Sequence, residues 1–365
     1  MADVFGLSVD PQALLGLPGC HESHKSRAEL PNGFPATLVS PLADVAEIST
    51  AIAGFKKSEP ELYQLSPETF PLPGLVERFA AYKSCLHEGP GFFTIRGLTP
   101  GKRDARENVI VHAGIASYLA TSGRCSSIFP GRKLMRSDVS NIREDPFLAP
   151  GNQSIGVGFH SDNGDNVSLY CRQVATSGGD LYLSSTWTIY NELATHRKDV
   201  VRVLAEPWLS QISRLGDDDL KSKNVPLFNF HDGKLVVDYQ KRPLRGTKEE
   251  PRDPRLKLLT FQQQEALSVV DKLAFENAIS VDQQVGDINF FNNLALLHAR
   301  SPFVDGEDGQ VRRHLTRLIF RDEAEGWSIP EHMKADWAKY YEHDSSAETF
   351  REEPCRWAWS LNGQD

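Results

Sequence analysis

The sequence predicts an α+β protein whose core is a barrel made of two antiparallel sheets. Helical periodicity dominates the first third of the chain, whereas short runs rich in β-branched and aromatic residues dominate the rest, with only single helices between them. The regular strand–helix alternation of a parallel sheet is missing. The chain also contains neither GxGxxG nor GxxxxGKS, so nucleotide binding of those kinds is unsupported.

The helical part of the chain follows an N-terminal arm. Residues 1–40 are rich in Gly, Pro, Ser and His, and we expect them to form an extended arm or cover. Apolar residues at helical spacing then predict helices over 41–63, 75–86 and about 107–121. Between the last two, the run GPGFFTIRGL at 89–98 is bracketed by glycines and predicts a buried strand.

Most of the predicted strands lie after residue 159. They are NVSLYCRQV (166–174), DLYLSST (180–186), KLVVDYQ (234–240), ISVDQQV (279–285), INFFNN (288–293), LALLHARSPF (294–303) and HLTRLIFRD (314–322). The pair Asp232-Gly233 predicts a hairpin turn before the third of these. Helices are expected over 187–196 and 261–277, the second with Thr260 as its N-cap. The charged run 240–257 predicts a solvated loop, with a moving lid as the alternative.

Composition and charge limit the functions that the chain can have. Its 365 residues include 40 Lys and Arg against 49 Asp and Glu, a net charge of −9, so general binding to nucleic acid or anionic membranes is disfavoured. The five cysteines form no CxxC pair, which is typical of reduced thiols in an intracellular protein. No secretory signal and no run of roughly 18 apolar residues is present, so we expect a cytoplasmic protein.

One histidine stands in an H-x-D pattern. In GFHSDNGD, residues 158–165, His160 and Asp162 lie two positions apart and therefore point to the same side of an extended segment. A ring nitrogen and a carboxylate oxygen placed in this way could hold one metal ion. The pattern alone is weak, because a turn in which Asp162 and Asn163 bond to the backbone explains the same residues.

A second histidine and two arginines lie nearer the C-terminus. His298 ends an apolar strand and would point into the barrel if the strand alternation holds, although a single histidine on an apolar face is more often a core residue. Arg313 and Arg317 share a later strand. If both lie on the face of Leu315, two guanidinium groups enter an apolar strand pair, which requires anionic partners. The alternative is an exposed edge strand with basic residues on its wet side.

Together these segments indicate a metal-dependent oxygenase. Two histidines and one carboxylate that leave coordination positions open are the arrangement of non-haem Fe(II) oxygenases. An arginine beyond the second histidine suits bidentate binding of the far carboxylate of a chelating 2-oxo acid.

The order of the segments resembles the taurine dioxygenase and clavaminate synthase-like family of Fe(II)/2-oxoglutarate-dependent oxygenases. The matching pieces span roughly residues 75–322 and are GPGFFTIRGL, FHSDNGDNVSLYC, SGGDLYLSSTWTIYNEL, GDINFFNNLALLHARSPF and RRHLTRLIFRD. The resemblance implies a distorted double-stranded β-helix (jelly-roll) core flanked by helices, with an insert between the metal-ligand motifs. We expect one catalytic domain over 41–330. A C-terminal extension over 331–365 would cover the barrel, with Trp327 or Trp337 as walls of the site or as ordinary caps.

The resemblance also assigns roles to individual residues. His160, Asp162 and His298 would bind Fe(II), with 2-oxoglutarate and O2 as cosubstrates. Arg317 would hold the distal carboxylate of 2-oxoglutarate, and Arg313 would assist it or contact the substrate.

One position departs from the family pattern. After Gly178-Gly179-Asp180, where many relatives carry a threonine whose hydroxyl helps to bind 2-oxoglutarate, this chain has Leu181. Leucine cannot donate that hydrogen bond, typically a net effect of about 1 kcal/mol. Substitutes could come from Tyr182, Ser184 or Arg313.

The implied reaction is oxidation of an unactivated C–H bond in a small polar substrate, such as an amino-acid-like compound or a natural-product intermediate. Succinate and CO2 would be released, and the outcome would be hydroxylation, desaturation or cyclisation. One alternative is a cupin-like hydrolase or isomerase that uses Zn²⁺ or Mn²⁺. Another is a degenerate oxygenase that only binds a metabolite. The expected partner is a small-molecule substrate, without nucleic acid or membrane, and the sequence leaves substrate identity and oligomeric state open.

Overall fold

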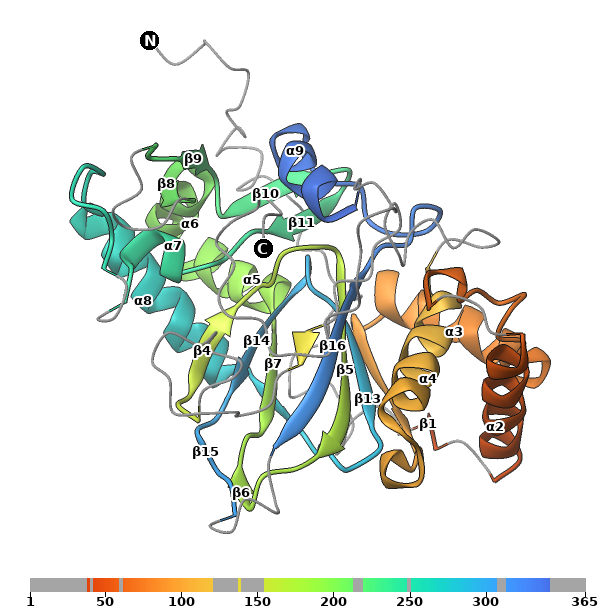
Figure 1. The fold of residues 1–365 in the computed structure, drawn as a ribbon. Helices are drawn as coiled ribbons and strands as arrows, with labels where there is room; N and C mark the ends of the chain where they lie inside the picture. The colour runs from red at the N-terminus through yellow and green to blue at the C-terminus, as the bar shows by residue number, and fades with distance from the viewer. Residues whose placement is uncertain are drawn as a thin grey trace.

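The core consists of two facing sheets with helices on the outer side of each (Figure 1). The computed structural model describes residues 38–39, 42–58, 62–120, 137–138, 154–212, 219–247, 251–306 and 313–341. This architecture of helices and antiparallel sheets agrees with the predicted α+β class. Nearly all of the expected N-terminal arm lies outside the described residues, except that Leu38–Val39 pairs in parallel with the first core strand.

The larger sheet has the strand order β1-β2-β13-β5-β16-β3. Its outer strands β1 and β3 are two residues long, and its central strands carry the long runs predicted from the sequence. The bounds are β1 Leu38–Val39, β2 Phe92–Arg96, β13 Ile288–Asn292, β5 Asn166–Gln173, β16 His314–Phe320 and β3 Ser137–Asp138.

The smaller sheet has the order β12-β7-β14-β4 and is antiparallel throughout its described pairings. The bounds are β12 Ile279–Val281, β7 Leu181–Ser185, β14 Leu296–Arg300 and β4 Val157–His160. A two-stranded ribbon, β6 Ser177–Gly178 with β15 Phe303–Val304, lies at one end of the barrel (Figure 1). The short strand β4 and the ribbon did not stand out in the sequence.

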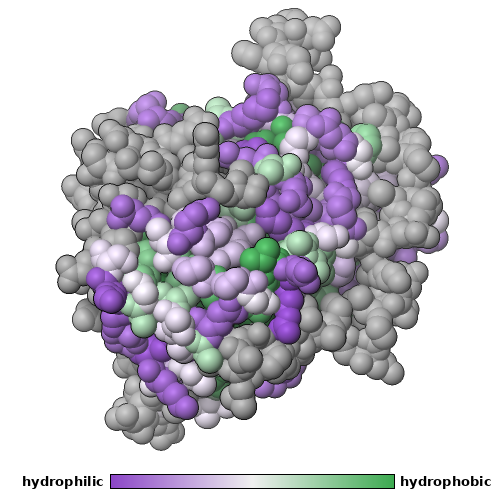
Figure 2. Space-filling view, turned by 90° about the vertical axis from the view of Figure 1, so that its right-hand side faces the viewer, coloured by the Kyte–Doolittle hydropathy of each residue, from purple (hydrophilic) through white to green (hydrophobic). Residues whose placement is uncertain are grey.

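Helices α3 (Val76–His87) and α4 (Ala105–Ser117) cover the larger sheet, and α2 (Leu42–Lys57) packs outside them against α4. Strand residues such as Phe93, Phe290 and Phe320 belong to the same apolar cluster as these helices. All three confirm the predicted helices, although α2 ends before Pro60. The start of α4 is fixed by a capping box in which Asp104 and Glu107 exchange side-chain and backbone bonds. Figure 2 views the side that carries these helices, where the described residues are mostly hydrophilic.

The outer face of the smaller sheet is covered by an insert between the two metal-ligand motifs. Its helices α5 (Thr186–His196), α6 (Lys198–Ala205) and α8 (Phe261–Glu276) pack against outward-facing strand residues such as Leu297 and Ala299. The insert also contains α7 Arg242–Arg245 and the hairpins β8 Trp208–Gln211 with β9 Ser222–Val225 and β10 Phe228–His231 with β11 Lys234–Val237. Sequence periodicity did not reveal α6 or the β8–β9 hairpin.

The turn predicted inside the insert is confirmed, whereas the solvated loop predicted over 240–257 holds only in part, because this run contains α7 and buried residues. Asp232 and Gly233 both adopt positive φ, 48° and 74°, in the β10–β11 turn. Described parts of the charged run 240–257 are anchored, because Leu244 and Leu256 are buried and Arg252 donates to the Leu209 carbonyl at 2.7 Å. A lid function for this run stays a prediction.

One apolar cluster lies under the helices of the larger sheet and a second lies under the insert helices. A third lies between the two sheets and is here called the barrel interior. It contains inward-facing residues of both sheets and of the segment after β16: Val167, Leu169, Cys171, Leu181, Leu183, Phe291, Leu294, Leu296, Leu315, Ile319, Trp327, Met333 and Trp337. The last two belong to helix α9, Glu331–Tyr341. Alternation along each strand therefore sends one set of side chains to the helices and the other set between the sheets. In the described part of the chain, no helix combines the length and the apolar character needed to cross a membrane.

The N-cap of α8 gives a testable prediction for the insert. The Thr260 hydroxyl accepts from the Gln263 amide at 3.2 Å, and the Gln263 side chain accepts from the Thr260 amide. Thr260→Ala should lower the free energy of unfolding by about 1 kcal/mol, measured by urea denaturation. Ser268→Ala on the exposed face of the same helix is the control and should change it by less than about 0.5 kcal/mol. Equal effects of the two variants would contradict the capping role.

Candidate metal centre

Two antiparallel strands bring the candidate metal ligands together. His160 at the end of β4 is the cross-strand partner of His298 in β14, and their ring centroids are 4.1 Å apart. Asp162 follows β4 by two residues. One donor atom from each of the three side chains lies within 4.8 Å of the others, and no second such group of His, Cys, Asp or Glu occurs among the described residues. The structure thus assembles the three predicted ligands, with His298 facing the barrel interior.

The carboxylate of Asp162 lies at the centre of this group. Its oxygens are 3.7 Å from Nε2 of His160 and 3.7 Å from Nε2 of His298. Nη1 of Arg317 donates to Oδ2 of Asp162 at 2.6 Å. The guanidinium of Arg317 is therefore in contact with a candidate ligand.

The segment Ser161–Asp165, here called the metal loop, is held by hydrogen bonds from other elements. The side chain of Asn293, just before β14, accepts from the Asp162 amide and donates to the Asp162 carbonyl, both at 2.7 Å. It also donates to the carbonyl of Gly164 at 2.7 Å. Ser161 and Tyr239 are joined twice, since the Ser161 amide donates to the Tyr239 carbonyl and the Ser161 hydroxyl accepts from the Tyr239 amide.

Sequence reasoning did not assign a role to Asn293. The sequence did contain a signal for such a role. An Asn-Asn pair between two apolar strands is a place where amide side chains bond to nearby backbone. Nothing in the sequence indicated that the backbone it binds lies about 130 residues earlier, at Asp162.

Burial sets the protonation states of the three candidate ligands. Burial lowers the pKa of His298 to about 3, and it also lowers the pKa of His160. Burial by itself raises the pKa of Asp162, but chiefly the nearby positive charge of Arg317 brings it down to about 2. At neutral pH the site therefore presents two neutral imidazoles and one carboxylate, which are the forms that bind a metal ion. This donor set fits Fe(II) with open positions for other ligands.

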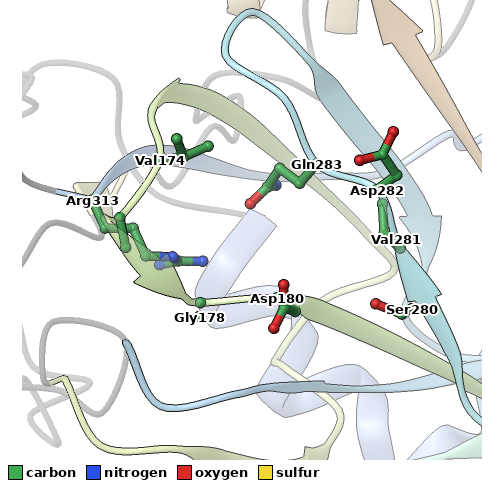
Figure 3. A pocket seen from close by; sticks show the side chains of 10 residues that line it. Val174, Gly178, Asp180, Ser280, Val281, Asp282, Gln283 and Arg313 are labelled. Atoms are coloured by element: carbon green, nitrogen blue, oxygen red, sulfur yellow. The ribbon is translucent and has the colours of Figure 1, made fainter. Parts of the chain in front are cut away.

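Arg313 enters the barrel at the end that carries the β6–β15 ribbon. It is 5% exposed, and its guanidinium carbon lies 5.4 Å from the ring centre of Phe303. Figure 3 shows the guanidinium pointing into a cavity of about 370 Å³, between Asp180 and Gln283. Burial lowers the pKa of Arg313 to about 10. The carboxylates that act on it are Asp180 and Asp305, and Asp305 accepts from the Arg313 backbone amide at 2.8 Å.

A third arginine, unassigned from the sequence, lies nearby. Arg300 follows His298 by two positions on the same face of β14, and its guanidinium carbon is 4.8 Å from the ring centre of Phe303. It donates to the carbonyl of Ile155. Burial, together with the charge of Arg313, lowers the pKa of Arg300 to about 9.

Leu181 occupies the barrel interior as a 3% exposed residue and is the cross-strand partner of Arg300. Tyr182 packs into the cluster beneath the insert helices, and Ser184 lies on the same outer side of β7 by alternation. Neither can replace an inward-facing hydroxyl at position 181. Of the substitutes considered from the sequence, only Arg313 faces the interior.

The sequence of the chain matches the model of the family described as taurine catabolism dioxygenase TauD, TfdA family, over residues 58–319. A taurine hydroxylase-like protein, SAT17, from Stachybotrys chartarum is 36% identical over 317 residues, which cover 84% of this chain and 81% of the relative. An FR-33289 synthase from Streptomyces rubellomurinus is 24% identical over 315 residues, covering 84% and 91% respectively.

Solved oxygenase structures share the fold. An asparagine oxygenase in complex with Fe(II), 3-hydroxyasparagine and succinate superposes with a TM-score of 0.59 and 14% identity, covering 79% of this chain and 97% of the other. The non-haem iron oxygenase OrfP in complex with Fe and α-ketoglutaric acid superposes with a TM-score of 0.54 and 14% identity, covering 78% and 94%. At this identity the likeness shows the fold alone, which agrees with antiparallel sheets flanked by helices.

The neutral state of His298 predicts how the stability of the metal-free protein depends on pH. The pKa of His298 is about 3 in the folded chain, against 6.5 for an ordinary histidine, so the unfolded chain binds an extra proton between these values. Stability from this residue is complete above pH 6.5 and is lost as the pH falls toward 3. Urea denaturation between pH 5.5 and 4 should show a loss of up to about 1.4 kcal/mol per pH unit.

The matched variant for this prediction is His298→Gln, which has no titrating ring. Its stability should fall less steeply with decreasing pH than that of the wild type. If the two proteins had parallel stability curves, His298 would titrate normally in the folded state.

Proposed function

The chain belongs to the TauD/TfdA family of dioxygenases and is therefore an Fe(II)- and 2-oxoglutarate-dependent oxygenase, and we propose that His160, Asp162 and His298 hold its iron. The observation that carries the proposal is that the register of β4 and β14 sets two neutral imidazoles side by side, with a carboxylate oxygen of Asp162 within 4.8 Å of a ring nitrogen of each. Family membership disfavours the hydrolase, isomerase and metabolite-carrier alternatives that the residues alone left open. We further propose that the two facing sheets form a double-stranded β-helix.

Bound iron supplies the redox chemistry that couples O2 to oxidation of the substrate and the cosubstrate. The residues of the chain orient its ligands and keep water away. Asn293 fixes the backbone of Asp162, and Arg317 fixes its carboxylate. The ring of Phe291 lies 4.9 Å from that of His298 and, with Leu183, gives the site an apolar wall. Such a wall limits hydrolytic side reactions.

We propose that Arg313, and not Arg317, holds the distal carboxylate of 2-oxoglutarate. This reverses the division of roles expected from the sequence. Arg317 already contacts a ligand carboxylate at 2.6 Å, which places it beside the metal. Arg313 directly precedes β16 and lies four residues before Arg317, a separation of roughly 13 Å for extended chain, and its long side chain can reach part of the way back. Its side chain is also buried, with Asp180 and Asp305 as nearby carboxylates, and it points into a cavity that can admit an anionic group.

The substrate is proposed to be a small polar compound that carries a carboxylate, such as an amino acid or a natural-product intermediate. Arg317 is 28% exposed at its side chain and lies beside the candidate metal ligands, so its guanidinium is placed to contact a substrate carboxylate. Solved relatives of the same fold are complexes with hydroxylated asparagine and arginine. Hydroxylation is the outcome that this likeness favours over desaturation or cyclisation.

The two arginine roles can be separated with one pair of variants. Arg313→Met should raise the 2-oxoglutarate concentration needed for half-maximal succinate formation by about 10- to 100-fold, because a charge-assisted bidentate contact is lost. Binding of 2-oxopentanoate, which lacks the distal carboxylate, should be unchanged. Arg317→Met is the matched variant and should leave the 2-oxoglutarate requirement within a few-fold of the wild type.

The opposite result would restore the sequence-based assignment. If Arg317→Met raised the 2-oxoglutarate requirement more than Arg313→Met, then Arg317 would be the anchor. If the wild type formed no succinate from 2-oxoglutarate with any amino-acid or metabolite substrate, the proposed use of the site would be wrong.

A further inference from the structure

The C-terminal helix α9 lies beyond residues 58–319, the part that matches the family model, yet it reaches the metal loop. Trp337 of α9 is 2% exposed and packs in the barrel interior together with Met333. Its indole N–H donates to the carboxylate of Asp165, the last residue of the metal loop. Helix α9 therefore does more than cover apolar surface.

Asp165 connects this contact to the metal ligands. It is 1% exposed, lies three residues after Asp162, and has the Arg321 guanidinium at 3.3 Å. Its carbonyl accepts from the amide of Asn293 at 2.9 Å, the same residue whose side chain fixes the backbone of Asp162. Asn293 therefore joins Asp165 to Asp162 through hydrogen bonds to both.

A second chain of contacts joins α9 to the same loop. Asp336 lies 3.4 Å from Nζ of Lys223, which is 2.6 Å from Asp238 at the end of β11. Gln240 donates to Asp238 at 3.4 Å and to Asn163 in the metal loop at 2.6 Å. Helix α9 thus contacts the metal loop directly through Trp337 and indirectly through the β11 side.

We propose that α9 is a clamp that positions the metal loop, with Trp337 and Asp165 as positioning residues for the metal centre. The inference rests on the proposed metal site. His160 is fixed by strand pairing, whereas Asp162 lies in a loop, so the clamp acts mainly on the carboxylate ligand. Partners outside the ligand set typically change metal affinity by about 10- to 100-fold when they are lost.

The test compares two buried tryptophans of the same cluster in the full-length chain. Trp337→Phe keeps an aromatic ring but removes the donor to Asp165, and it should weaken Mn²⁺ binding by about tenfold in calorimetric titrations of the metal-free protein. Trp327→Phe is the matched control, because its indole donates to the carbonyl of His87 and not to Asp165. It should bind Mn²⁺ like the wild type, even if both variants lose similar stability.

Hydrogen exchange on the wild-type protein provides a test that needs no variant to fold. Added Mn²⁺ should slow amide exchange both in the metal loop and in α9, and leave α2 unchanged. Protection of the metal loop without α9, or equal Mn²⁺ affinity of Trp337→Phe and Trp327→Phe, would overturn the clamp while leaving the metal site intact. No Mn²⁺ binding by the wild type would overturn the proposed metal site and the clamp with it.

Discussion

The pairing of β4 with β14 is the constraint on which the rest of the site depends. It places His160 opposite His298, and because side chains alternate along a strand, a slip of one residue would turn one imidazole to the outer face. The register is enforced on both sides of β14. Leu296 and His298 face the barrel interior, whereas Leu297 and Ala299 pack under the insert helices. Burial of apolar surface by two clusters thus fixes the positions of two metal ligands.

The carboxylate ligand is held by a different device. Asp162 lies in a loop, so no backbone hydrogen bonds to a neighbouring strand fix its position. Hydrogen bonds from residues far away in the sequence hold it instead. Asn293 binds its backbone, Arg317 its side chain, and Trp337 the end of the loop. Removing charged and polar groups from water costs free energy unless they find partners. These partners keep Asp162 ionised in a buried place and restrict its position.

The sequence signals for the candidate site were local, namely the pattern H-x-D, the apolar run before His298 and the later arginines. The structure brings His160, Asp162 and His298 together, although β14 continues past His298 to Arg300. The roles of Arg313 and Arg317 could not be ranked from spacing, because both share one strand face. What separates them is their contacts, namely Asp162 for Arg317 and the Phe303 ring for Arg313.

The features that the sequence did not reveal depend on long-range contacts. Long periodic helices such as α8 were recognised, with the cap at Thr260, because their signals are local. Strand β4 is only four residues long, and what it does, which is to place His160 opposite His298, depends on its pairing with β14. The contact of Trp337 with Asp165 spans 172 positions, and either residue alone looks like an ordinary member of a helix or a turn. Chain topology, which no residue pattern encodes directly, creates these contacts.

The central claim is that His160, Asp162 and His298 form an iron site that accepts a chelating 2-oxo acid. The most direct measurement is an anaerobic titration of 2-oxoglutarate into the Fe(II)-loaded protein, followed by the weak visible charge-transfer band of the chelate. The account predicts a saturable band in the wild type and none in His160→Ala. Iron binding without a band in the wild type, or an equal band in the variant, would contradict it.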